Sequence, residues 1–106
     1  MMTLHTFKGF VDGAREAYIK AVEKHPQFTD MVTLHDVQTV QTFLEEQRKM
    51  NDGFVKLGKD PSFSGILQEE VFEYMEASLN GDTEAAKREL LDCAAVLMRE
   101  WERISQ

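Results

Sequence analysis

The sequence predicts an all-α protein: a chain of four helices in which the last two form an antiparallel hairpin. Apolar residues recur at spacings of three and four in four segments, which is the pattern of helices with one packed face. No segment alternates apolar and polar residues between turns, so no sheet is expected. The 106 residues contain neither a long linker nor an internal repeat, and we expect one domain over 1–106.

The first two helices are predicted from apolar spacing, proline and capping residues. The first is expected from about Leu4 to Lys24, and Pro26 ends it because the residue before a proline disfavours the helical region. Thr33 or Asp36 can cap the second helix, which should stop near Gly58. The apolar stripe of the second helix comprises Val37, Val40, Phe43, Leu44, Met50, Phe54 and Val55.

The third and fourth helices are separated by a short polar turn. Ser62 or Ser64 can cap the third helix, and Asn80-Gly81 should close it with a left-handed residue. Asp82 or Thr83 can cap the fourth helix, which is expected to run almost to the C-terminal residue. So short a turn brings the two helices together as an antiparallel hairpin.

These two helices carry two pairs of acidic residues. Glu70 and Glu73 form the first pair, and Glu89 and Asp92 form the second. Residues three apart share a helix face, so each pair places two carboxylates side by side, where like charges repel. Selection for helix stability alone gives no reason to place such a pair twice. The pattern therefore indicates a site that uses the four carboxylates together.

Asp92 is the most informative of these acids. It lies in a run, 90–98, that has no other charge, and a helix so apolar on nearly every side is expected to be buried on more than one. A buried ionised Asp costs free energy unless a cation or hydrogen-bond donors compensate it. Four carboxylates between two helices would make an oxygen-rich site for a divalent cation, above all Mg²⁺.

Other charged residues on the two helices are assigned by their angular positions. Arg99 and Arg103 continue the line of Asp92 along the fourth helix. Two acids followed by two guanidinium groups would suit a metal–polyphosphate ligand, so these arginines are candidate substrate-binding residues. Glu69 and Glu76 are expected to face water on the opposite side of the third helix.

A purely structural interpretation of the same residues stays open. Acidic pairs three residues apart are common on solvated helix faces. Asp92 could be a buried acid in an ion pair with Arg88 or Arg99. Arg99 and Arg103 could form surface pairs with Glu100 or Glu102, which would contribute little to stability.

The segment from about Leu67 to Arg99 resembles the MazG-type all-α nucleoside triphosphate pyrophosphohydrolases. That superfamily is marked by E-x-x-E, a variable spacer and E-x-x-D. Glu70 and Glu73 match the first half of the motif, and Glu89 and Asp92 match the second. The doubled glutamate that opens the first half, the Asn-Gly-Asp turn and the apolar run around Asp92 make the resemblance more specific than the bare pattern.

The resemblance implies hydrolysis of a nucleoside triphosphate between its α- and β-phosphates, giving the monophosphate and pyrophosphate. The four acids would bind Mg²⁺, with Mn²⁺ as an alternative, and Glu73 and Glu70 would be the catalytic carboxylates that orient or deprotonate water. Residues 62–105 would be the acidic metal-binding helix pair of a MazG-like bundle completed as a homodimer or homotetramer. The helix within 1–30 has no clear counterpart, and the Cys-Pro-Trp-Asp stretch of longer MazG proteins is absent.

Composition excludes several other classes of protein. The formal net charge of −7 argues against binding a nucleic-acid polymer, which needs clustered positive charge. No apolar stretch is long enough to span a membrane. The single cysteine, Cys93, excludes an internal disulfide and fits a reducing cytosol, where a buried and inert thiol is its expected state. We therefore expect a cytoplasmic protein.

Three competing functions are weighed against the pyrophosphohydrolase. A phosphoribosyl-ATP pyrophosphohydrolase has similar acidic helices, but its distinguishing sequence is not found here. A di-iron carboxylate bundle needs Glu-x-x-His steps, and no histidine follows a glutamate by three. A non-enzymatic helical interaction module would also explain the apolar faces. Substitution of Asp92 by an apolar residue would distinguish this module from an enzyme: a scaffold would become more stable, whereas an enzyme would lose activity.

Overall fold

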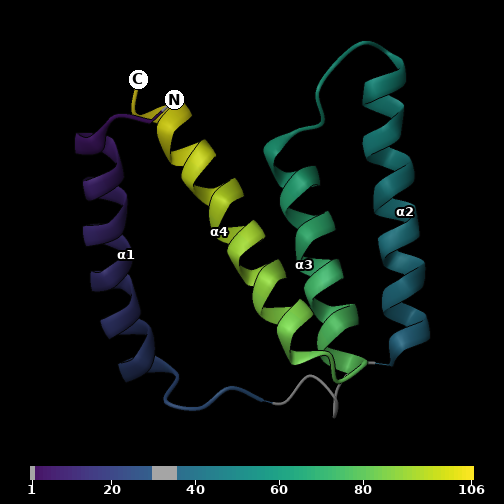
Figure 1. The fold of residues 1–106 in the computed structure, drawn as a ribbon, viewed down its shortest axis with the longest axis horizontal. Helices are drawn as coiled ribbons and strands as arrows, with labels where there is room; N and C mark the ends of the chain where they lie inside the picture. Colours follow the sequence, from purple (N-terminus) through teal and green to yellow (C-terminus); the bar gives the residue numbers. More distant parts are fainter. Residues whose placement is uncertain (1, 30–35) are drawn as a thin grey trace. The chain divides into compact units, whose positions relative to one another are not determined.

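The computed structural model describes residues 2–29 and 36–106, and these residues form four helices and no strand (Figure 1). The helices are α1 (Leu4–Lys24), α2 (Val37–Lys56), α3 (Phe63–Leu79) and α4 (Thr83–Ile104). The all-α prediction is confirmed, and each helix begins and ends close to its expected bounds. Within the described ranges, no helix is both long and apolar enough to cross a membrane.

Polar caps fix the beginnings of α2, α3 and α4. Asp36, Ser62 and Asp82 each accept a hydrogen bond from the backbone N–H three residues further on, at 2.8, 3.1 and 3.0 Å. Each bond satisfies one of the N–H groups that the first turn of a helix leaves without a partner. The structure thus selects Ser62 as the cap of α3, while Thr33, the alternative cap of α2, lies outside the described residues.

A left-handed glycine turns the chain between α3 and α4. Gly81 has a φ of +74°, a conformation that residues with a Cβ rarely adopt. The backbone N–H of Asp82 donates to the carbonyl of Ala77 at 3.0 Å, and that of Gly81 donates to Ser78 at 3.1 Å. These bonds satisfy carbonyl groups at the end of α3, as in a glycine-terminated helix. The predicted hairpin turn is confirmed, and it starts α4 back along α3 (Figure 1).

The chain divides into two compact units, each of which is described by itself. The first unit consists of Met1–Thr29 and Leu97–Gln106, and the second of Asp30–Val96. In the first unit, the rings of Phe10 and Trp101 meet edge to face, with centroids 5.9 Å apart. The second unit contains α2, α3 and the N-terminal part of α4, and therefore all four carboxylates of the predicted site. That the whole of 1–106 is one domain stays a prediction.

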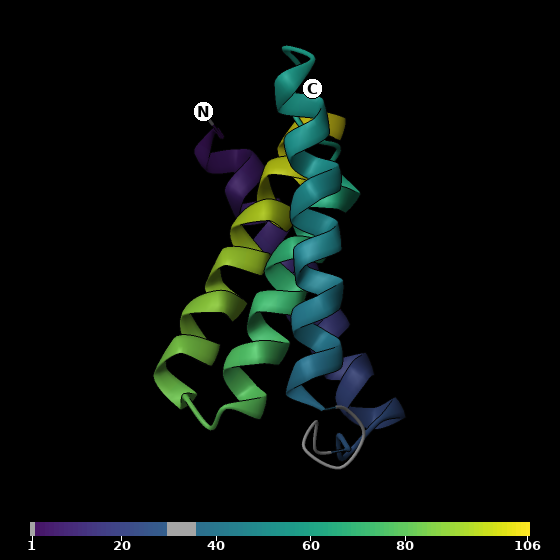
Figure 2. The same cartoon turned by 90° about the vertical axis from the view of Figure 1, so that its right-hand side faces the viewer.

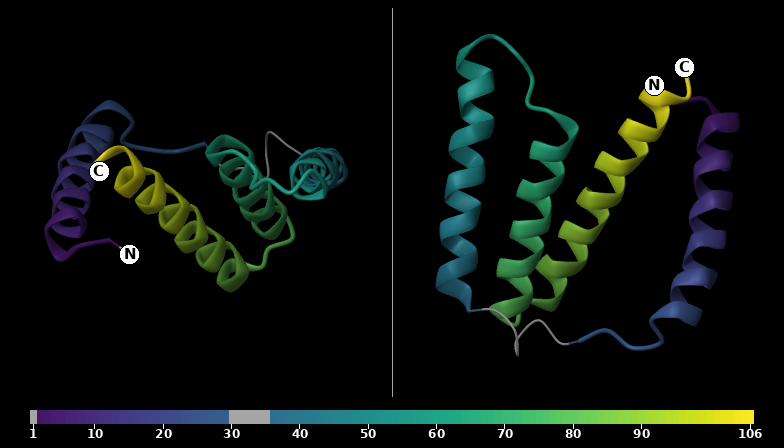
Figure 3. Two further views of the ribbon diagram at one scale, coloured as in Figure 1. Left: turned by 90° about the horizontal axis from the view of Figure 1, so that it is seen from above. Right: turned by 180° about the vertical axis from the view of Figure 1, so that it is seen from behind.

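In the second unit, α2 packs along α3, as the views in Figures 2 and 3 show. Val40 and Leu44 form the core of this packing and are 0% and 1% exposed. Full burial of such side chains stabilises the folded state by about 1.5–3 kcal/mol each. Beside them, the rings of Phe43 and Phe72 lie with centroids 5.9 Å apart. The core is small, so polar contacts matter for the register of the two helices.

A buried amide pair extends the contact between α2 and α3. The side-chain amide of Asn51 donates to the carbonyl of Gly65 at 3.1 Å and to the Oε1 of Glu69 at 3.0 Å. Gln47 donates to Asn51 Oδ1 at 3.2 Å. A Cβ at Gly65 would lie only 2.6 Å from Asn51 Oδ1, so glycine permits this close approach. These bonds fix α3 against α2 and thereby orient the carboxylates of α3.

The predicted burial of α4 is not found. None of its residues is buried; Leu90 is 52% and Leu91 71% exposed. Asp92 is exposed as well, so the expectation that it lies buried in an apolar surrounding is wrong for the single chain. The apolar run encircles the helix, whereas a hairpin partner covers one side of it. The rest of that surface is left to solvent.

Candidate metal centre

Three of the four predicted carboxylates come together across the α3–α4 hairpin. Glu70 and Glu73 lie one turn apart on α3, and Glu89 faces them from α4. One ligand oxygen from each residue lies within 4.8 Å of those of the other two. All three residues are half-buried. We refer to Glu70, Glu73 and Glu89 as the carboxylate cluster; it could hold a metal ion.

Burial and mutual repulsion raise the pKa of each carboxyl group in the cluster. For Glu70, burial is the largest cause, and the charges of Glu73 and Asp92 add to it, while a hydrogen bond with Glu89 acts in the opposite direction. For Glu89, burial again leads, followed by that hydrogen bond with Glu70 and by Glu70's charge. A hydrogen bond between two carboxyl groups requires a proton on one of them. The carboxyl groups of the cluster therefore hold their protons to higher pH than isolated glutamates do, and a bound cation would relieve the same repulsion.

Glu73 is the member of the cluster that has a cationic partner. Arg48 of α2 donates from Nη2 to Glu73 Oε1 at 3.1 Å. Burial raises the pKa of Glu73, the hydrogen bond from Arg48 lowers it, and Glu89 raises it; the net direction is upward. One guanidinium group therefore does not neutralise the cluster.

Two carboxylate oxygens of the cluster are buried without a hydrogen-bond partner in the described part of the chain. They are Glu70 Oε2 and Glu89 Oε2. Buried polar atoms are normally paired, and an unpaired carboxylate oxygen carries a substantial desolvation cost. Oxygen donors are the ligands that Mg²⁺ and Mn²⁺ prefer. The donor set and its unpaired oxygens fit a divalent cation.

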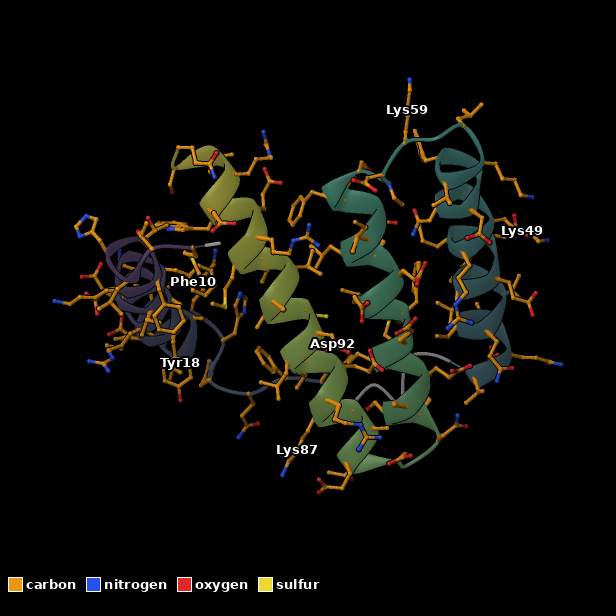
Figure 4. All side chains as sticks on the ribbon, turned by 45° about the horizontal axis from the view of Figure 1, so that its top comes forward. Phe10, Tyr18, Lys49, Lys59, Lys87 and Asp92 are labelled. Atoms are coloured by element: carbon orange, nitrogen blue, oxygen red, sulfur yellow. The ribbon has the colours of Figure 1, made fainter. Side chains whose placement is uncertain are left out.

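Asp92, the fourth predicted ligand, lies on α4 one turn beyond Glu89 (Figure 4). It is not one of the three residues whose ligand atoms gather, but its charge raises the pKa of both Glu70 and Glu89. It is therefore near enough to contribute to the negative potential of the cluster. Among the described residues it forms no ion pair, so the pairing with Arg88 or Arg99 is not found.

The predicted substrate-binding arginines, Arg99 and Arg103, belong to the other compact unit. Arg103 donates from Nε to Glu100 Oε1 at 2.9 Å and pairs with it on the protein surface. That surface pair agrees with the structural interpretation of Arg103. A role for either arginine in binding substrate stays a prediction.

Two acidic residues that we expected on the water-facing side of α3 are only partly exposed. Glu69 is half-buried and accepts the hydrogen bond from Asn51, and Glu76 is half-buried in the wall of a pocket. The assignment of Glu69 was wrong because α2 covers a side of α3 that the hairpin alone would leave exposed, whereas Glu76 lines an open pocket. A signal was present in the sequence: Gln47 and Asn51 continue the spacing of Val40 and Leu44, which places two amides on an apolar stripe.

The pocket lies beside the carboxylate cluster, near the hairpin turn. It is open and has a volume of about 330 Å³. Its walls come from α2, α3, the turn and α4, and its lining residues are Arg48, Glu73, Glu76, Ala77, Asn80, Asp82, Ala85 and Glu89. Glu73 and Glu89 belong to both the pocket and the cluster, so a ligand in the pocket would lie next to a cation held there.

The surroundings of Cys93 disfavour the reactive form of its thiol. Its thiol is half-buried, and burial followed by the charges of the nearby carboxylates raises its pKa. The reactive form of cysteine is the thiolate, which these surroundings disfavour.

The chain matches no protein-family model, no curated protein and no solved structure with which it was compared. The resemblance described above thus depends on the acidic motif and on its placement in a helical hairpin.

Proposed function

We propose that this protein is a Mg²⁺-dependent nucleotide pyrophosphohydrolase that converts a nucleoside triphosphate into the monophosphate and pyrophosphate. The observation that carries the proposal is the carboxylate cluster: three acids from an E-x-x-E and an E-x-x-D step meet across a hairpin. A helix pair with no ligand to bind would gain stability by separating such charges. The unpaired oxygens of Glu70 and Glu89 support the same conclusion.

The chemistry divides between the metal and the carboxylates. Bound Mg²⁺ supplies positive charge that polarises the phosphates and stabilises the charge that develops on them. Glu70, Glu73 and Glu89 would hold the ion, and Asp92 would add negative charge at the same end of the hairpin. Glu73 or Glu70 accepts a proton from a water molecule while the water oxygen bonds to the α-phosphorus. The bond between that phosphorus and the oxygen bridging to the β-phosphate breaks, and pyrophosphate leaves.

A raised pKa suits the proton acceptor in this step. A general base is most effective when its pKa lies near the working pH, and burial moves the carboxyl groups of Glu70 and Glu73 in that direction. A carboxylate that is only partly used by the metal can orient the water and then take its proton. The coordination of the metal decides which of the two carboxylates accepts the proton.

A nucleotide panel tests the proposed reaction. With Mg²⁺ present, at least one nucleoside triphosphate should yield equal amounts of monophosphate and pyrophosphate, and a chelator should stop the reaction. Phosphoribosyl-ATP belongs in the panel, because its selective hydrolysis would assign the histidine-pathway type of enzyme instead. Chromatography of the products distinguishes these outcomes. Release of orthophosphate in place of pyrophosphate would show that a different bond is broken.

Self-association forms part of the proposal, as a homodimer or homotetramer. The exposed apolar residues of α4 support it: Leu90, Leu91, Leu97 and Ile104 are each more than 40% exposed. Exposed apolar surface of this kind is commonly covered by a partner. The same observation favours the second candidate function, a non-enzymatic helical interaction module.

Substitution of Leu91 by glutamate should convert an oligomer into a monomer. Leu91 is 71% exposed in the single chain, so the new charge costs little there but would be buried at an interface. Light scattering on the wild type and the variant measures the masses directly. Lys56→Gln, at an exposed position on α2, is the control and should leave the mass unchanged. A wild-type protein of monomer mass at micromolar concentration would contradict the prediction.

A further inference from the structure

Arg48 is the one cation that the described structure places on the carboxylate cluster, although the acidic motif does not include it. Its side chain is 50% exposed, whereas that of its partner Glu73 is 22% exposed. Only Nη2 of the guanidinium group makes a hydrogen bond within residues 2–29 and 36–106. The group has five N–H donors in a planar fork, so most of its donor capacity is available to a ligand.

Arg48 and the cluster border the same pocket. Arg48 comes from α2, Glu73 from α3 and Glu89 from α4, and all three line the open space of about 330 Å³. A ligand in this space can contact both a cation bound to Glu73 and Glu89 and the guanidinium group of Arg48, which lies beside Glu73. The α3–α4 hairpin alone does not make this arrangement; it requires the packing of α2 against α3.

The charges of the pocket restrict the ligands that it can accept. Its lining carries four acids, namely Glu73, Glu76, Asp82 and Glu89, and the single cation Arg48. A free polyphosphate would be repelled by such a surface. A polyphosphate that carries a divalent cation is different, because the carboxylates bind the metal while a planar guanidinium group matches the oxygens of a phosphate.

We propose that Arg48 binds a phosphate group of the metal-bound substrate in this pocket, exchanging its hydrogen bond to Glu73 for one to a phosphate oxygen when Glu73 binds Mg²⁺. The inference rests on the proposed function and adds to it a substrate-binding residue. Without metal, Arg48 occupies an oxygen of Glu73 and reduces the repulsion in the cluster. Mg²⁺ bound to Glu73 would compete with the guanidinium group for that carboxylate, and the guanidinium group would be released toward the pocket.

The test compares Arg48→Gln with the wild type in two calorimetric titrations, one with Mg²⁺ alone and one with inorganic pyrophosphate in saturating Mg²⁺. Mg²⁺ affinity should be unchanged or higher in the variant, because Glu73 loses a competitor for the metal. Pyrophosphate affinity should fall roughly tenfold to a hundredfold, the usual effect of losing a hydrogen bond to a charged group. In assays of the best substrate of the panel, KM should rise more than kcat falls.

Lys49→Gln is the matched control. It removes the same charge one residue further along α2. Lys49 lies on the side of α2 away from α3 (Figure 4), and among the described residues its one ion pair is with Glu46. It should bind Mg²⁺ and pyrophosphate as the wild type does. Circular dichroism should show that both variants are folded, because the Arg48–Glu73 pair is exposed enough that its loss should cost little stability.

The outcomes separate this inference from the proposed function. If the wild type binds Mg²⁺ and pyrophosphate and Arg48→Gln binds both equally well, the role of Arg48 is refuted while the proposed function stands. If folded Arg48→Gln loses Mg²⁺ binding as well, Arg48 orders the carboxylates and does not bind phosphate, which also overturns the inference. If the wild type binds neither probe and cleaves no nucleotide, the proposed function is wrong and this inference falls with it.

Discussion

Replacement of Glu89 by glutamine should lower turnover by roughly two to four orders of magnitude, while the fold becomes no less stable. Glu89 is the one member of the carboxylate cluster on α4, so its loss leaves a cation with ligands from a single helix. Its raised pKa shows that the ionised carboxylate is disfavoured where it lies. Glutamine keeps the shape and removes the charge. Steady-state kinetics and thermal denaturation without metal measure the two effects.

Asp92→Asn is the companion variant. This substitution should also lower turnover and Mg²⁺ affinity, because the charge of Asp92 acts on Glu70 and Glu89. Its effect on the stability of the apo protein should be smaller than that of Glu89→Gln, since Asp92 is exposed. Glu84→Gln is the control: Glu84 is exposed on α4 and lies outside both the cluster and the pocket. Wild-type turnover in folded Glu89→Gln would refute the proposed site.

Without divalent cations, the three cluster carboxylates should destabilise the protein progressively as the pH rises. The folded-state pKa of Glu70, Glu73 and Glu89 is raised above the unfolded value, so the folded protein holds protons more tightly than the unfolded chain. Their contribution to stability is fully present below the unfolded pKa and is lost as the pH rises through the folded pKa. Melting temperatures of the metal-free protein between about pH 4 and pH 8 measure this loss.

Mg²⁺ should reverse that loss, and its effect should increase with pH because it binds the deprotonated carboxylates. At a hundredfold excess over Kd, a ligand that binds only the native state adds about 2.7 kcal/mol to stability. For a domain of this size, such a gain raises Tm by several degrees. A rise in Tm that is equally large at every pH would contradict this assignment of the metal ligands.

Glu89→Gln is again the informative comparison, because other acids titrate over the same range. The pKa of Glu100 is lowered by its hydrogen bond with Arg103, so that pair acts in the opposite direction and is lost as the pH falls. The difference between wild type and variant removes this common contribution. The variant should show both a weaker dependence of Tm on pH and a smaller effect of Mg²⁺.

The local structure of this protein follows from its sequence because it depends on neighbouring residues. Asp36 and Ser62 cap the next turn of the chain through bonds that span three residues, and Gly81 ends α3 because a left-handed residue is needed there. The E-x-x-E spacing places Glu70 and Glu73 on one helix face whatever surrounds the helix. With so short a turn, the approach of Glu89 to that face could also be expected.

Only the tertiary structure decided which sides of these helices are covered. Periodicity assigns a residue to a face of its own helix, but burial depends on what packs there. The packing of α2 against α3 buries Gln47 and Asn51, gives Glu69 a hydrogen-bond donor and brings Arg48 to Glu73. None of the residues of α4 is buried, and Asp92 is exposed despite its apolar neighbours. Contacts between residues distant in the chain thus form the pocket beside the acidic motif and place the guanidinium group of Arg48 in its wall.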